Sequence, residues 1–109
     1  SKMIIYVDID GTICTLNSSD DENKDQSFDP AGYEDAQPIE ENIDKINKLY
    51  DEGHTIIYWT ARGTVTKIDW IELTRQQLFE WGCKCHDVRV GKPQYDLWID
   101  DKSMRIEEV

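Results

Sequence analysis

Basic residues are scarce in this chain of 109 residues. Twelve Lys and Arg stand against 23 Asp and Glu, which leaves a formal net charge of −11 at pH 7. A surface so poor in cations repels the phosphate backbone of nucleic acids and anionic membranes, so we expect neither as a partner. The acids are concentrated, because residues 20–35 hold seven of them against one lysine.

Long apolar runs and abundant cysteines are also missing. No stretch approaches the roughly 20 apolar residues of a membrane-spanning helix, and no signal peptide precedes the first expected strand. The three cysteines, Cys14, Cys83 and Cys85, cannot all pair and do not form the framework of a secreted protein. We therefore expect one cytoplasmic domain over residues 1–109.

The residues that are present alternate between strand and helix patterns. Apolar runs predict four strands, at 3–8, 54–60, 86–90 and 95–100. The first run is continuous, which is typical of a parallel strand buried on both faces.

Two helices are expected between these strands. The first begins at Pro38 and ends at Gly53, and the second begins at a capping box formed by Thr66 and Asp69 and ends at Gly82. The polar and acidic stretch 13–37 predicts a long loop, which we expect to lie at the active site. The order predicts an α/β, Rossmann-like three-layer sandwich with a mainly parallel sheet of about four strands.

Polar side chains follow the end of each expected strand. In chain order they are Asp8 and Asp10, Thr60, Lys92, and Asp100 and Asp101. Ligands of an open parallel sheet bind at the carboxyl ends of its strands. Carboxylates gathered there need a cation, and their hard oxygens suit Mg²⁺, whereas Lys and Thr suit phosphate oxygens. Each feature alone has an ordinary explanation as a turn or cap, but together they indicate phosphoryl transfer.

These motifs resemble those of the haloacid dehalogenase superfamily of aspartyl-phosphate hydrolases. The family's D-x-D-G-T is Asp8-Ile-Asp-Gly-Thr12, and its Thr, Lys and acidic pair are Thr60, Lys92 and Asp100-Asp101. All four motifs occur in the family order between residues 3 and 101. The stretch 38–63 and the short interval from Lys92 to Asp100 look most like the small capless phosphatases of capsule and surface-polysaccharide biosynthesis.

The resemblance implies a role for each motif. Asp8 would be the nucleophile that becomes an aspartyl phosphate, and Asp10 would protonate the leaving alcohol and then deprotonate water. Thr60 and Lys92 would hold the phosphoryl oxygens. Mg²⁺ would be held by the Asp8 carboxylate, the Asp10 carbonyl and Asp100, with Asp101 bound directly or through water.

Four groups in or beside the motifs are further candidates for phosphate contact. They are the backbone N–H groups of Ile9 and Ala61, together with that of Asp10, and the side chain of Arg62. For Arg62 the sequence leaves two interpretations open, contact with substrate or pairing with a surface acid.

The resemblance implies a Mg²⁺-dependent phosphatase for a sugar phosphate or another small metabolite. A phosphotransferase or mutase is an alternative, but it needs water excluded, and the intervals 13–38 and 61–91 are too short for a cap domain. A catalytically silent binding module is a second alternative. A signalling receiver domain has its lysine and acidic pair in the opposite order. The open site of a capless domain also favours a homo-oligomer.

Overall fold

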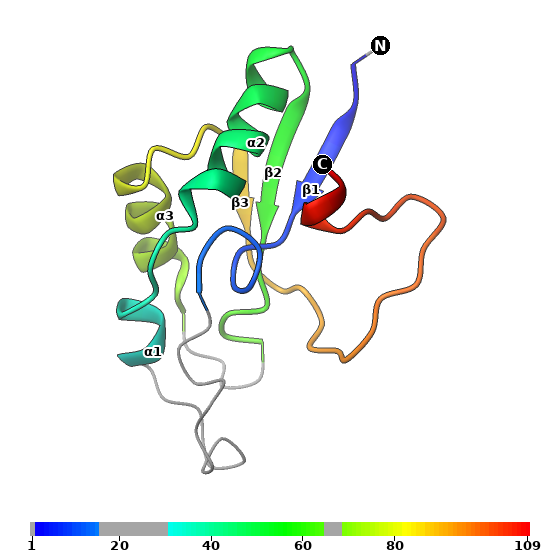
Figure 1. Ribbon diagram of the computed structural model, residues 1–109. Coiled ribbons are helices and arrows are strands. Elements are labelled where there is room, and N and C mark those ends of the chain that lie inside the picture. The colour runs from blue at the N-terminus through cyan, green and yellow to red at the C-terminus, as the bar shows by residue number, and fades with distance from the viewer. Residues whose placement is uncertain (1, 16–30, 65–68) are drawn as a thin grey trace.

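The computed structural model describes residues 2–15, 31–64 and 69–109 (Figure 1). Its elements in chain order are β1 (Ile4–Val7), α1 (Ala31–Glu34), α2 (Glu40–Asp51), β2 (Thr55–Trp59), α3 (Ile71–Glu80), β3 (Asp87–Arg89) and the 3₁₀ helix η1 (Ile106–Glu108). None of the helices in these ranges has the length and apolar character needed to cross a bilayer.

The sheet is parallel, in the order β1-β2-β3. Ile5 of β1 pairs with Ile56 of β2, and Tyr58 of β2 pairs with Val88 of β3. The α/β fold with a parallel sheet flanked by helices is confirmed, although the described sheet has three strands rather than about four.

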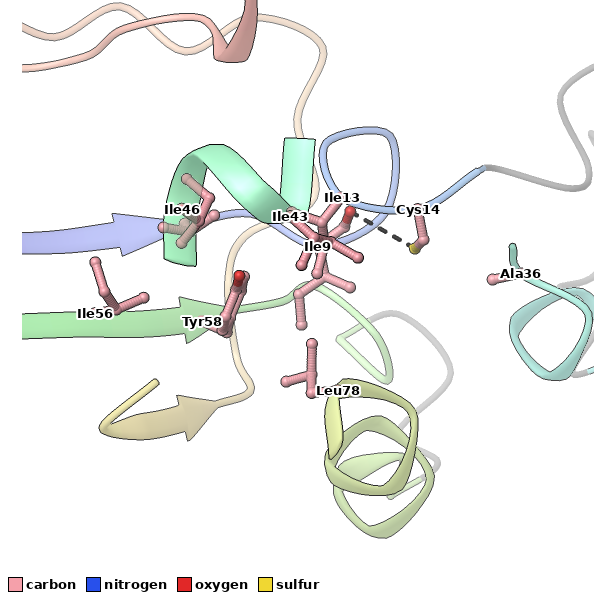
Figure 2. Packing of buried hydrophobic residues seen from close by; sticks show 10 residues of the cluster. Ile9, Ile13, Cys14, Ala36, Ile43, Ile46, Ile56, Tyr58 and Leu78 are labelled. Carbon is pink, nitrogen blue, oxygen red and sulfur yellow. Dashed lines mark hydrogen bonds between the residues drawn. The ribbon is translucent and has the colours of Figure 1, made fainter. Parts of the chain in front are cut away.

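The core lies between the sheet and its helices. Ile56 and Tyr58, alternate residues of β2, point to the side of the sheet where α2 lies with Ile46 (Figure 2), and Leu78 of α3 belongs to the same buried cluster. The opposite face of the sheet carries an aromatic group, in which Trp59 packs edge-on against Tyr6 and against Trp98, with ring centroids 5.7 and 6.2 Å apart. The central strand is therefore covered on both faces.

Both helices end close to the expected positions, but α3 begins at Ile71, later than the expected start at Thr66. α2 begins two residues after Pro38, and Glu40 and Glu41 in its first turn suit the positive end of the helix dipole. Asp69 was expected inside the first turn of the second helix, but it precedes α3, whose N-cap is Trp70 without a side-chain cap bond. The Asp69 side chain accepts a hydrogen bond from the Ile71 N–H at 3.0 Å instead, so the expected role of Asp69 in a capping box is wrong. The other half of the expected capping box, Thr66, lies outside the described residues, as does 16–30 of the acidic loop.

Two expectations about strands are wrong. The first strand is not buried on both faces: β1 lies at the edge of the described sheet, and Ile4 is 71% exposed. The run at 95–100 forms no strand, because it leaves the sheet after Pro93 and finds no strand partner there (Figure 1). Leu97 and Ile99 are accordingly exposed. An apolar run indicates strand-forming residues, but a strand also needs a neighbour to accept its hydrogen bonds.

Candidate active site

A tight turn after β1 sets the positions of Asp8 and Asp10. Ile9, between them, is buried in the core together with Ile13 (Figure 2). Gly11 adopts φ +85°, which a residue with a side chain rarely adopts, and its N–H donates to the Cys14 carbonyl at 2.8 Å. The turn is thus anchored by apolar side chains, and the two carboxylates flank the buried Ile9.

Asp8 is an accessible carboxylate with two partners. Its side chain is 36% exposed, and Oδ1 lies 3.1 Å from Lys92 Nζ. Its other oxygen, Oδ2, accepts a hydrogen bond from the Thr12 hydroxyl at 3.2 Å. A carboxylate oriented by a cation and a hydroxyl, and open to solvent, is placed to react with a small anionic ester.

Lys92 reaches Asp8 from a largely buried position. Burial disfavours its charge, but a hydrogen bond with Tyr95 and the nearby Asp8 carboxylate outweigh burial and raise the pKa of Lys92. The ammonium therefore stays charged at neutral pH. It also lies 5.1 Å from the centroid of the Tyr95 ring, a cation–π contact.

Backbone hydrogen bonds join Lys92 to the end of β2. The Thr60 N–H donates to the Arg89 carbonyl at 3.0 Å, and the Lys92 N–H donates to the Thr60 carbonyl at 3.1 Å. The Thr64 hydroxyl donates to the Lys92 carbonyl at 2.7 Å. The structure thus places Thr60 and Lys92 side by side, as expected from the ends of parallel strands.

Asp10 has a different environment from Asp8. Its carboxylate accepts hydrogen bonds from the Arg62 guanidinium at both oxygens, Nη2 to Oδ1 at 2.7 Å and Nε to Oδ2 at 2.9 Å. Burial disfavours the Arg62 charge, but the bonds to Asp10 outweigh it and raise the pKa of Arg62. Of the two interpretations of Arg62, the structure has it pairing with an acid, which is Asp10 of the motif rather than a surface acid.

Asp100 and Asp101 are not gathered with Asp8 and Asp10. Both lie on the exposed segment that leaves the sheet (Figure 1), where Asp101 pairs with Lys102 at 3.1 Å. Bonds from Asp101, from the Lys102 N–H and from Trp98 lower the pKa of Asp100. Across the described ranges, no three Asp, Glu, His or Cys side chains come together as a metal site. The ligand set expected for Mg²⁺ therefore does not fit this arrangement, because no fourth strand carries the acidic pair to Asp8.

The other candidates surround the same turn. Ile9 contributes a buried side chain, and Ala61 follows Thr60, with its carbonyl accepting from the Thr64 N–H at 2.9 Å. An open hollow of about 440 Å³ adjoins this loop, and its lining includes Gly63, Thr64 and Gly91. Neither Asp8 nor Lys92 is among the residues that line the hollow.

Sequence reasoning missed two polar residues of α3. Thr74 and Gln77 are buried, and both accept hydrogen bonds from Arg62 Nη1, at 3.2 and 2.6 Å. Their spacing of three residues places them on one side of the helix, the side that also carries Leu78. The sequence signal that could have revealed Thr74 and Gln77 is their helical spacing from the apolar Leu78, which places two polar side chains on the side of the helix that faces the core.

Comparisons with known proteins support the fold. No family model matches the chain, and no curated protein matches it. A crystal structure of a structural-genomics target from Vibrio cholerae superposes with a TM-score of 0.78 at 24% identity, over 99% of this chain and 86% of that one. At this identity the likeness concerns the fold, which is the α/β arrangement described above.

Proposed function

We propose that this chain is a phosphomonoester hydrolase that uses Asp8 as its nucleophile. The observation that carries the proposal is the accessible Asp8 carboxylate, held by Lys92 and Thr12 at the carboxyl end of a parallel strand. The D-x-D-G-T, Thr and Lys motifs support the same chemistry. A small metabolite such as a sugar phosphate is the proposed substrate, the cytoplasm the proposed location, and a homo-oligomer the proposed assembly.

The reaction has two displacements at phosphorus. An Asp8 oxygen bonds to phosphorus while the ester P–O bond breaks, and the leaving oxygen takes a proton from Asp10, which enters this step as the protonated carboxylic acid. Water then bonds to phosphorus while the bond between phosphorus and Asp8 breaks, and the proton of the water goes to Asp10. Inorganic phosphate leaves, and both carboxyl groups return to their first state.

Lys92 and Thr60 provide the charge and hydrogen bonds for the transferred group. The Lys92 ammonium has three N–H donors, so it can hold phosphoryl oxygens while remaining near Asp8. The Thr60 hydroxyl oxygen accepts a hydrogen bond from the backbone N–H of Arg62 at 3.0 Å. The hydroxyl proton of Thr60 therefore remains available to donate to a phosphoryl oxygen. Both groups stabilise negative charge that grows on the phosphoryl oxygens.

Dependence on Mg²⁺ is part of the proposal and comes from the motifs. In the described arrangement Asp100 is not near Asp8, so a shared ion requires the 93–105 segment in another position. Removing divalent cations with EDTA should abolish hydrolysis, and Mg²⁺ should restore it. If turnover in EDTA is undiminished, the proposed dependence on Mg²⁺ is wrong, but the proposal that Asp8 is the nucleophile is unaffected.

The test of the proposed function is hydrolysis of p-nitrophenyl phosphate and of a panel of sugar phosphates with Mg²⁺ present. Asp8→Asn should lower kcat by at least about 1000-fold, as expected when a nucleophile is removed. The matched control is Asp96→Asn, at an exposed carboxylate. Fluoroberyllate should inhibit the native chain competitively. A native chain without activity on the whole panel, or an Asp8→Asn variant with full activity, contradicts the proposal.

A further inference from the structure

The Arg62 guanidinium is buried and its donors are engaged on two sides. The residue is 1% exposed. One edge of the guanidinium holds both oxygens of Asp10, and the remaining nitrogen, Nη1, donates to Gln77 and Thr74 of α3. Arg62 is therefore a bridge between the turn after β1 and the inward face of α3.

The bridge continues into α1. Gln77 Nε2 donates to the Tyr33 carbonyl at 2.6 Å, and the Tyr33 ring lies 4.5 Å from the Arg62 guanidinium carbon. Tyr33 in turn packs edge-on against Trp70, the residue before α3, with centroids 5.1 Å apart. A ring, an amide and a hydroxyl thus fix the plane of the guanidinium.

This geometry differs from that of an arginine that binds a phosphate group. An arginine that binds substrate presents its N–H fork to solvent, whereas the fork of Arg62 faces Asp10 and its face is covered by Tyr33. The side chain of Asp10 is itself only 15% exposed, so its orientation depends on Arg62 more than on water.

We infer that Arg62 is a positioning residue that fixes the carboxyl group of Asp10 for proton transfer, and that Gln77 and Thr74 hold Arg62 in that position. The inference rests on the proposed function, because Asp10 transfers protons only if the chain hydrolyses phosphate esters. Proton transfer needs the carboxyl group within hydrogen-bond reach of the leaving oxygen and then of water. A shift of about 1 Å in such a group can cost about 100-fold in rate.

Arg62→Lys tests this inference, since lysine keeps the charge but cannot bond both Asp10 oxygens in one plane. We expect kcat to fall about 100-fold, with KM changed by less than about threefold. Gln77→Leu should lower kcat about tenfold and Thr74→Val by less, because each removes one of the groups that hold Arg62. Arg75→Lys, at an exposed arginine of the same helix, is the control and should leave both parameters unchanged.

A double-mutant cycle separates positioning from direct contact with substrate. If Arg62 acts through Asp10, adding Arg62→Lys to Asp10→Asn should cause no further loss in kcat. Losses that multiply, or a large rise in KM with kcat retained, identify Arg62 as a substrate contact and overturn the inference.

Thermal unfolding of each variant identifies any loss that comes from misfolding. If Arg62→Lys does not fold, Gln77→Leu decides, and an unchanged kcat there overturns the inference. A native chain that hydrolyses esters while Arg62→Lys is fully active refutes the positioning role alone. A native chain that hydrolyses none refutes the proposed function, and the positioning role with it.

Discussion

Asp8 and Asp10 are two residues apart and have opposite surroundings. The Asp8 side chain is the more exposed of the two and contacts the Lys92 ammonium, whereas the Asp10 side chain is 15% exposed and is held at both oxygens by Arg62. Ile9 between them is buried in the core and anchors the turn that carries both carboxylates. This difference suits a nucleophile that must meet substrate and a proton-transfer group that must keep one orientation.

The first prediction at this scale concerns Lys92. Lys92→Met keeps the length of the side chain and removes the charge that offsets the phosphoryl oxygens. We expect kcat/KM to fall by about 100- to 1000-fold, as when one charge-stabilising donor is lost from an active site. The control is Lys102→Met, at an exposed lysine, and steady-state kinetics on p-nitrophenyl phosphate measures both. If kcat/KM falls no further in Lys92→Met than in Lys102→Met, the proposed role of Lys92 is wrong.

A second prediction concerns the thiols in alkaline solution. Burial, together with the nearby Asp10 carboxylate, raises the pKa of Cys14 from 9.0 to about 12. Burial also raises the pKa of Cys83 to about 11 and raises the pKa of Tyr58. Between about pH 9 and 11 the unfolded chain loses thiol protons that the folded chain keeps, so the stability that depends on them is full below pH 9 and falls above it.

Cys14→Ala isolates one of these protons. Between pH 9 and 11 the free energy of unfolding of the variant should fall less steeply than that of the native chain, by up to about 1.4 kcal/mol per pH unit. Urea denaturation at several pH values measures the two slopes. Equal slopes contradict the assignment of this alkaline loss to the Cys14 thiol.

Among the elements, β2 is the most deeply packed strand of the sheet. It lies between β1 and β3, and its Ile56 is 0% exposed, whereas Ile4 of β1 is largely exposed. The same residue type therefore occurs in two neighbouring strands with opposite burial, which offers a matched pair.

Ile56→Ala and Ile4→Ala test this difference. Ile56→Ala leaves a cavity in the core and should lower the free energy of unfolding by about 3 kcal/mol. Ile4→Ala removes an exposed side chain and should lower it by about 0.5 kcal/mol or less. Urea denaturation with a common m-value compares them. Similar losses contradict the description of β1 as an exposed edge.

For the whole molecule, the net charge of −11 acts on every anionic ligand that approaches. A phosphate ester must reach Lys92 through a field of the same sign as its own charge, and salt screens that field. We expect kcat/KM for a dianionic sugar phosphate to rise about two- to threefold between about 20 and about 200 mM NaCl.

Phosphocholine is the matched control, because its cationic group offsets part of its phosphate charge and should weaken the dependence on salt. Stopped assays of released phosphate suit both substrates. If kcat/KM for the sugar phosphate falls with salt instead, the local charges of Lys92 and Arg62 dominate over the net charge.

The alternation of strands and helices could be predicted from the amino-acid sequence, and so could the placement of Asp8, Thr60 and Lys92 at neighbouring strand ends. These features depend on apolar periodicity, on caps and on a glycine turn, all of which act between residues close in the chain. Parallel pairing then follows from the order of the elements, which is why the α/β fold could be predicted.

The pairing of residues that are distant in the sequence could not be predicted and is seen in the folded chain. Arg62 meets Asp10 across 52 residues and Gln77 meets Tyr33 across 44. The edge position of β1 and the separation of the acidic pair at Asp100 from Asp8 were also not predicted. The physical reason is that a buried guanidinium or an apolar strand needs a partner, but the sequence does not specify which of many distant groups packing will bring to it.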